Sequence, residues 1–327
     1  MTAAKRRRWF ANVIVGVATV LMAAAPAIRA ETPGRLNIGL QKSSLSLIVL
    51  KFRSTLDRRL EPLGVNVTWT EFPAGPQLLE ALSVGSIDFG MTGDTPPIFA
   101  QAVGTNLVYV GNEPPKPEAS AIIVKEGSPI QSLAGLRGKK IALTKGSNAH
   151  YLVVRALATA DIDYRDITPV YLTPAEARAA FETDRVDAWA IWDPYLASAE
   201  KSLSLRTLKT GKGLVSNHTF YLANKAYANA HEDVIALLFD ELSRNERFLR
   251  ENPKEVARIL ANYTGLDAPT FERVLERQPS FRVSYIEPWV ADEQQAIADH
   301  FQRLNLIPNT IVVKDIVWQP AQAHARN

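Results

Sequence analysis

The alternation of short apolar runs with amphipathic stretches is the feature that most constrains the fold of this 327-residue chain. Short apolar or alternating runs predict strands, and apolar residues near every third or fourth position predict helices. Repeated strand–helix alternation predicts an α/β fold in which mostly parallel sheets are covered by helices on both faces. Strands are expected at 35–40, 65–72, 87–90, 106–111, 121–124, 140–143, 170–172, 188–191 and 220–223. Helices are expected at 45–60, 77–84, 97–103, 151–160, 174–182, 232–263 and 269–304, with a helical turn at 133–136.

A proline-rich segment, Glu113-Pro114-Pro115-Lys116-Pro117, interrupts this alternation. Proline removes a ladder donor and restricts the direction of the chain. The alternation then restarts and ends in a helical return, which predicts two lobes joined by crossings near Pro117 and Ala223. Ligands of open α/β sheets bind beyond the carboxyl ends of strands, so a cleft is expected between the lobes. The expected domains are lobe I at 35–117 and 224–327 and an inserted lobe II at 118–223.

Residues 1–30 have the features of an export signal. A basic group at 5–8 precedes an apolar run at 13–25, and Ala27 or Ala30 would end a cleavage site. The apolar run is shorter than the roughly 20 residues that span a bilayer, which disfavours an uncleaved anchor. An arginine pair within the basic group loosely fits a twin-arginine signal, so the Sec and Tat routes both stay open. A bacterial periplasm is the expected location.

Removal of this segment changes the charge balance of the chain. Residues 1–30 hold five of the 37 Lys and Arg residues and none of the 34 Asp and Glu residues, so the chain from Glu31 has a formal net charge of −2. Nucleic-acid binding therefore has no compositional support. The chain has no cysteine, which excludes disulfides, thiol nucleophiles, thiolate metal sites and a lipid-modified N-terminal cysteine.

Three predicted helices begin behind glycine or serine turns. The three segments are Lys145-Gly146-Ser147-Asn148-Ala149-His150, Thr92-Gly93-Asp94-Thr95-Pro96-Pro97 and Phe72-Pro73-Ala74-Gly75-Pro76. A helix start presents free N–H groups and a partial positive charge, so it can hold an anion without contributing a proton. The pattern predicts a protein that binds a small anion and releases it unchanged.

Four segments together resemble the aliphatic sulfonate-binding proteins of ABC importers, which are relatives of the taurine- and nitrate-binding proteins. The segments are 71–77 (EFPAGPQ), 92–97 (TGDTPP), 110–117 (VGNEPPKP) and 189–195 (WAIWDPY), and the resemblance runs from about Leu36 to Gln319. It implies a two-lobe periplasmic binding protein of type II that closes on a sulfonate and docks on a membrane permease. A monomer without cofactor or metal is expected. Taurine, sulfate esters or another small anion remain alternative ligands.

A sulfonate carries one negative charge and three equivalent acceptor oxygens, so convergent neutral donors suit its binding and its release. Backbone N–H groups at the helix starts, with nearby hydroxyl and amide groups, are the expected donors. The expected ligand-binding residues are Gln41, Ser44, Gly75, Thr92, Gly93, Asp94, Gly146, Ser147, Asn148, His150, Trp192 and Asp193.

Some of these positions have a second interpretation. Gly75 and Gly93 also suit tight turns, and Gly146-Ser147 also suits a turn followed by an N-cap. His150 is either a ligand contact or a partly exposed helix residue, and the helix dipole is expected to lower its pKa. The other four histidines form no ligand-spaced pair with it, so no metal site is expected.

Alternation along the strand at 188–191 places Trp189 and Trp192 on opposite faces. Trp192, at the carboxyl end, is expected to form a wall against the ligand, and Trp189 is expected in the core. Asp193 is expected to cap the next turn or to bind a cationic group of the ligand. Tyr221 fits either packing at the second crossing or a ligand contact.

An enzyme and a sensor are the alternative classes. A related desulfinase relies on a cysteine nucleophile, which this chain lacks, and Asp94, Asp193 and His150 would be the remaining acid–base groups. Sensors carry this kind of domain fused to a helix-turn-helix or a transmembrane segment, and neither is recognisable in the sequence.

Overall fold

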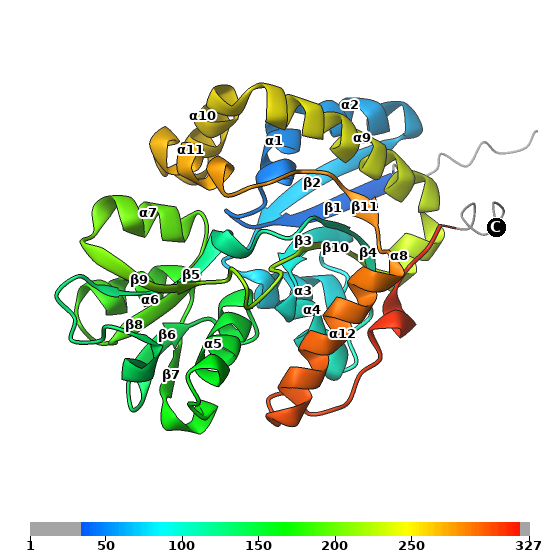
Figure 1. Cartoon of the computed structure of the whole chain (residues 1–327). Coiled ribbons are helices and arrows are strands. Elements are labelled where there is room, and N and C mark those ends of the chain that lie inside the picture. Colours follow the sequence, from blue (N-terminus) through cyan, green and yellow to red (C-terminus); the bar gives the residue numbers. More distant parts are fainter. Residues whose placement is uncertain (1–33, 321–327) are drawn as a thin grey trace, which may run out of the picture. The chain divides into compact units, whose positions relative to one another are not determined.

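The computed structural model describes residues 34–320, whose strands form two sheets (Figure 1). The first sheet contains β1 (Gly34–Leu40), β2 (Val65–Glu71), β3 (Phe89–Gly93), β4 (Leu107–Glu113), β10 (Thr219–Asn224) and β11 (Ser284–Tyr285), in the order β11-β4-β10-β3-β1-β2. The second sheet contains β5 (Ser120–Lys125), β6 (Lys140–Leu143), β7 (Thr168–Tyr171), β8 (Ala188–Trp192) and β9 (Leu205–Thr210), in the order β7-β6-β8-β5-β9.

Most strands of each sheet run in one direction. In the first sheet β1 is parallel to β2 and β3, and β10 is antiparallel to both β3 and β4. In the second sheet β6 is parallel to β7 and β8, and β5 is antiparallel to both β8 and β9. The reversed strands β5 and β10 are the ones that the chain forms first after each passage between the sheets. The expected α/β class with mostly parallel strands is confirmed.

Both faces of the first sheet are covered by helices, because its strands carry apolar residues on both sides. In β4, Leu107 and Tyr109 pack on one face, and Val108 and Val110 pack on the other. The first face is covered by α3 (Gly75–Ser83), α4 (Thr95–Ala102) and α12 (Pro288–Arg303). The second face is covered by α1 (Leu45–Arg53), α2 (Thr55–Leu60), α8 (Lys225–Ala230) and α9 (Glu232–Glu251).

The second sheet follows the same rule. Ile122 and Val124 of β5 pack toward α5 (Asn148–Thr159), and Ala121 and Ile123 pack on the opposite face with residues of α6 (Pro174–Glu182) and α7 (Tyr195–Ser202). Helices α10 (Pro253–Thr264) and α11 (Ala268–Glu276) pack with α1 in a further apolar cluster, which includes Ala197 of α7.

Three expected helices are interrupted in the structure. The helix expected at 232–263 is divided into α9 and α10 at Asn252, directly before Pro253. The helix expected at 45–60 is interrupted at Ser54, whose φ of 49° is left-handed and separates α1 from α2. The helical stretch expected at 269–304 is interrupted between α11 and α12, where β11 joins the edge of the first sheet. Helix α7 and strand β9 were not expected, because both are short and half polar.

The chain passes between the sheets at 114–119 and at 211–218. The second passage lies earlier than the crossing expected near Ala223, because Thr219–Asn224 already pairs within the first sheet. The assignment of two lobes with the boundaries given above stays a prediction. The export signal expected at 1–30 lies outside the described residues. Among residues 34–320, no helix has the length and apolar character needed to cross a membrane.

Candidate ligand-binding site

A cavity lies where carboxyl ends of strands from both sheets meet the two connecting segments. Gln41 follows β1, Gly93 ends β3 and Trp192 ends β8, in agreement with the position expected for ligands of α/β sheets. The cavity is lined by Gln41, Ser43, Leu45, Gly75, Met91, Gly93, Pro96, Lys116, Ala119, Ser147, Asn148, Trp192, Asp193, Asn217, His218, Thr219, Val274 and Gln278.

The structure brings part of the expected site together. The expected residues that line the cavity are Gln41, Gly75, Gly93, Ser147, Asn148, Trp192 and Asp193. The expected residues that are absent from its lining are Ser44, Thr92, Asp94, Gly146 and His150. Contact of the first group with a ligand stays a prediction. The second group lies outside the lining.

The start of α5 provides backbone donors at the cavity. Within residues 34–320, no hydrogen bond uses the N–H groups of Asn148 and Ala149, the first two residues of this helix. The start of α4 offers less than expected, because its second and third residues are Pro96 and Pro97, which have no N–H group. Within residues 34–320 the unpaired helix-start donors that line the cavity are therefore the N–H of Asn148 in α5 and the N–H of Gly75, the first residue of α3.

The turn before α5 uses its own donors internally, so Gly146, which is absent from the lining, and Ser147, which lines the cavity, do not offer free N–H groups. The Gly146 N–H donates to Nδ1 of His150 at 3.2 Å, and the Ser147 N–H donates to the carbonyl of Thr144 at 3.1 Å. The Ser147 hydroxyl donates to the same carbonyl at 2.7 Å, and its oxygen accepts from the His150 N–H as an N-cap. Of the three residues expected to supply backbone donors here, Asn148 is the one whose N–H group is free.

His150 is fully buried and packs against Phe99, Tyr164, Tyr171 and Phe301, with ring centroids 5.3–6.0 Å apart. Burial, with a smaller contribution from the nearby Lys145, lowers the pKa of His150 to about 3. The expected direction is confirmed, and burial is the main cause. A neutral imidazole that accepts the Gly146 N–H supports the turn, so His150 is not a ligand contact.

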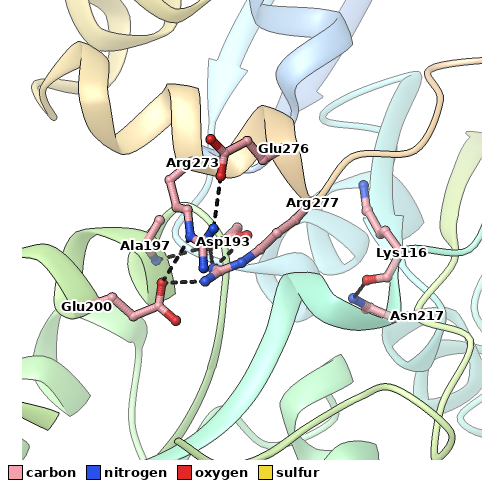
Figure 2. Close-up of polar contacts among 8 residues, drawn as sticks. All are labelled: Lys116, Asp193, Ala197, Glu200, Asn217, Arg273, Glu276 and Arg277. Atoms are coloured by element: carbon pink, nitrogen blue, oxygen red, sulfur yellow. Dashed lines mark hydrogen bonds and ion pairs between the residues drawn. The ribbon is translucent and has the colours of Figure 1, made fainter. Parts of the chain in front are cut away.

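Gly93 permits a close approach between β3 and α5. A Cβ atom at Gly93 would lie 1.9 Å from Oδ1 of Asn148, so any other residue at this position would displace the Asn148 amide. The Asn148 amide donates to Oδ1 of Asn217. The Asn217 amide donates to the carbonyl of Lys116 at 2.9 Å (Figure 2). Asn148, at the start of α5, is therefore joined to both connecting segments.

Among residues 34–320, Lys116 is the only lysine or arginine that lines the cavity. Its ammonium nitrogen lies 3.6 Å from Oε2 of the buried Glu113. The other oxygen of Glu113 accepts hydrogen bonds from Ser46 at 2.9 Å and from Tyr221 at 2.7 Å. Tyr221 is fully buried and does not line the cavity, so its role is packing next to the passage between the sheets.

Asp193 is the only acidic residue that lines the cavity. Its Oδ1 accepts the Ala197 N–H at 3.0 Å, which confirms the expected cap on the following turn. The cation next to it belongs to the protein, because Nη1 of Arg277 lies 3.1 Å from Oδ1 and 3.3 Å from Oδ2 (Figure 2). Burial raises the pKa of Asp193 to about 6, and Arg277 opposes that shift.

Asp94 does not share the cavity with Asp193. Its side chain is buried, its Oδ1 accepts from the Thr95 hydroxyl at 2.9 Å, and burial raises its pKa to about 6. Thr92 and Ser44 also make local hydrogen bonds: the Thr92 hydroxyl donates to the Gly93 carbonyl, and the Ser44 hydroxyl accepts from the Gln41 N–H. The expected acid–base pair on facing sides of a cleft is therefore absent from the cavity lining.

The apolar part of the lining is formed by Trp192 and four smaller residues, Leu45, Met91, Pro96 and Val274. Trp189 is fully buried against Phe181 at a ring distance of 5.8 Å, as alternation predicted for the core residue. The lining residues that sequence reasoning missed include Lys116, Asn217, His218 and Gln278. Only Lys116 has a sequence signal, the proline-rich segment around it.

Comparisons with known proteins identify the family of this chain. A family model described as NMT1/THI5 like matches residues 62–260. An aliphatic sulfonates-binding protein of Escherichia coli (strain K12) is 43% identical over 317 residues, which are 96% of this chain and 99% of that protein.

Two solved structures show the same similarity. The alkanesulfonate-binding protein SsuA from Xanthomonas axonopodis pv. citri, bound to MOPS, has a TM-score of 0.84 and 43% identity over 88% of this chain and 99% of that chain. The periplasmic aliphatic sulphonate binding protein SsuA from Escherichia coli has a TM-score of 0.80 and 44% identity over 88% of this chain and 93% of that chain. The protein therefore belongs to the aliphatic sulfonate-binding family, among the NMT1/THI5-like proteins, as its four sequence segments predicted.

Proposed function

We propose that this protein binds aliphatic sulfonates in the bacterial periplasm and delivers them to an ABC permease for sulfur uptake. The observation that carries the proposal is the composition of one cavity. It combines the free N–H group of Asn148 and the ammonium of Lys116 with the apolar surface of Trp192 and its neighbours, and the free N–H group of Ala149 follows directly at the same helix start. A ligand with a small anionic head and an alkyl tail matches both parts.

The anionic head is assigned to the start of α5. A sulfonate remains charged at any physiological pH, and the helix dipole with two unpaired N–H groups stabilises such a charge without proton transfer. Lys116 adds a charge whose strength is moderated by Glu113, 3.6 Å away. Moderate attraction suits a carrier, because the carrier must also release its ligand.

The proposed mechanism is a clamp with a hinge at 114–119 and 211–218. Lobe I was expected at 35–117 and 224–327, and lobe II at 118–223. Because β10 belongs to the first sheet, the proposed boundary between lobe II and the second part of lobe I lies before Thr219. Sulfonate would shift an existing equilibrium between open and closed forms, in proportion to its differential affinity for the two. The proposal includes export directed by residues 1–30, action as a monomer and docking of the ligand-bound form on the permease.

Binding without turnover is favoured by the state of the two aspartates. Asp94 lies outside the cavity lining, and Asp193 is neutralised by Arg277. His150 is buried and neutral. Asp94, Asp193 and His150 therefore do not face the ligand space as a general acid–base set, and transport is the function that the geometry supports best.

Thermal unfolding of the chain from Glu31 tests the proposal, with ethanesulfonate, octanesulfonate, taurine, sulfate, a sulfate ester and nitrate as ligands. At about 100 times its dissociation constant a ligand should stabilise the fold by about 2.7 kcal/mol, which raises Tm by a few degrees. An increase with alkanesulfonates and none with nitrate or sulfate is expected. An increase with nitrate or sulfate alone, or none with any sulfonate, would contradict the assignment.

A further inference from the structure

The cavity lining contains one carboxylate, that of Asp193, which could in principle pair with an amino group of a ligand. This carboxylate is already paired with Arg277. Asp193 is the single acidic residue of the lining, and its side chain is only 5% exposed. Its two oxygens accept from Arg277 and Ala197. A carboxylate in this state has little capacity left to pair with an ammonium group.

Arg277 is held in place by more than Asp193. It follows the last turn of α11, its side chain is 9% exposed, and its Nη2 donates to Glu200 of α7 (Figure 2). Val274 and Gln278 of the same segment line the cavity, so the guanidinium lies directly behind the cavity wall. Its two acidic partners, Asp193 and Glu200, together fix the orientation of the guanidinium.

The charge next to the ligand follows from this pairing. With Asp193 neutralised, Lys116 is the remaining full charge of the lining, and it is positive. An aminosulfonate such as taurine would bring an ammonium group into a partly buried space with a cation and without a free carboxylate. Burying such a charge without a partner is costly.

We propose that Arg277 determines specificity by pairing with Asp193, so that the pocket selects alkanesulfonates over aminosulfonates of the same length. This inference rests on the proposed function, because it concerns which sulfonates the same cavity accepts. Arg277 acts through Asp193 as a positioning residue and does not itself line the cavity. Removal of its charge should make Asp193 available to a ligand ammonium.

The test compares two ligands of nearly equal size, taurine and propane-1-sulfonate, which differ by an ammonium group in place of a methyl group. Dissociation constants are measured by titration calorimetry at pH 8.5, well above the pKa of about 6 of Asp193. Wild-type protein is expected to favour propane-1-sulfonate by about tenfold or more. Arg277→Gln, which keeps a hydrogen-bond donor but removes the charge, is expected to reduce that preference by about tenfold.

Three controls separate this effect from damage to the fold. Arg277→Lys keeps the charge and should retain the wild-type preference. Arg273→Gln removes a neighbouring arginine that pairs with Glu200 and Glu276 but not with Asp193, so the preference should also be retained. The double variant Arg277→Gln, Asp193→Asn lacks the carboxylate and should not gain taurine binding.

Equal affinity of the wild-type protein for the two ligands would overturn the inference while leaving the proposed function intact. If the wild-type protein bound neither ligand, the result would instead contradict the proposed function. An unchanged preference in folded Arg277→Gln would also overturn the inference. Should Arg277→Gln fail to fold, Asp193→Asn is measured instead. Because the carboxylate paired with Arg277 is not available to a ligand ammonium, the preference for propane-1-sulfonate should stay within about twofold of the wild-type value, and a selective loss of taurine binding in this variant would contradict the proposal.

Discussion

At the scale of single residues, Gly93 is required by a contact and not only by a turn. A side chain at this position would overlap Asn148, whose backbone N–H is assigned to the ligand. Gly93→Ala is therefore expected to displace the start of α5 and to weaken sulfonate binding by about tenfold or more. Calorimetry measures the change. Gly127→Ala is the control, because a Cβ atom there meets nothing within 4 Å, and equal affinities in both variants would contradict the assignment.

His150 should make stability depend on pH. Its pKa is about 3 in the folded state and about 6.5 in the unfolded chain, so its contribution is complete above pH 6.5 and is lost as the pH falls toward 3. Between pH 7.5 and 5.0 this loss amounts to about 2 kcal/mol. Denaturant unfolding of wild-type protein and His150→Asn at both pH values should show a smaller pH dependence in the variant.

Asp94 acts in the opposite direction within the same range. Its pKa is raised to about 6 in the folded state, so its stabilising contribution grows as the pH falls through 6. The total pH dependence of the unfolding free energy therefore combines both groups. The contribution of His150 is obtained from the difference in unfolding free energy between variant and wild-type protein at each pH. His231→Asn, at an exposed position, is the control for His150→Asn, and an identical pH dependence in both variants would contradict the interpretation of His150.

The lining residues predicted from the sequence follow strands directly, as Gln41, Gly93 and Trp192 do. Their position depends on a local rule, that ligands lie beyond the carboxyl ends of parallel strands. Arg277 and Asn217 could not be predicted in this way, because they follow α11 and β9 and reach the site only through tertiary packing. The pairing of Asp193 with Arg277 could not be predicted for the same reason, because it exists only where α11 packs against α7.

At the scale of elements, the N-cap of α5 should link stability to binding. Ser147→Ala removes the oxygen that accepts the His150 N–H and should lower the free energy of unfolding by about 1 kcal/mol. Binding should also weaken modestly, because the free N–H groups of Asn148 and Ala149 lose their fixed position. Thr173→Ala removes the exposed capping box of α6 and should cost about as much stability without any loss of affinity. Equal effects of both variants on affinity would contradict this difference.

The expected and observed elements agree where the sequence has a strong local signal. Helix α6 and strand β6 have the expected bounds, and α6 begins with Thr173, Pro174 and Glu176 in a capping box. Strand β11 was missed because it has two residues and exists only through pairing with β4. Helix α7 was missed because it has only eight residues and its N-cap position is Pro194, which offers no side-chain acceptor.

At the scale of the whole molecule, the two connecting segments are held to each other and to the start of α5. The Lys116 N–H donates to the carbonyls of Ser216 and Asn217, and Asn217 returns a side-chain hydrogen bond to the Lys116 carbonyl. Asn148, at the start of α5, joins this pair through its side-chain hydrogen bond to Asn217. The residues assigned to the anion and the residues of the proposed hinge are therefore in direct contact, which gives ligand binding a physical route to a change in hinge geometry.

Asn217 is the residue at which this connection can be tested. Its φ of 54° is left-handed, its side chain is buried, and it bonds to Asn148 and Lys116. Asn305 has nearly the same φ, 55°, but is exposed, so Asn305→Ala measures the backbone cost alone. That cost should be about 1 kcal/mol of unfolding free energy, without a change in affinity.

Asn217→Ala removes two hydrogen bonds in addition and should cost about 2–3 kcal/mol. It should also weaken sulfonate binding by about tenfold, because the start of α5 loses its anchor on the hinge. Denaturant unfolding and calorimetry on the two variants separate these effects. Asn217→Ala with wild-type affinity would mean that the hinge and the anion site are neighbours without energetic coupling. A selective loss of affinity would show that one asparagine couples them.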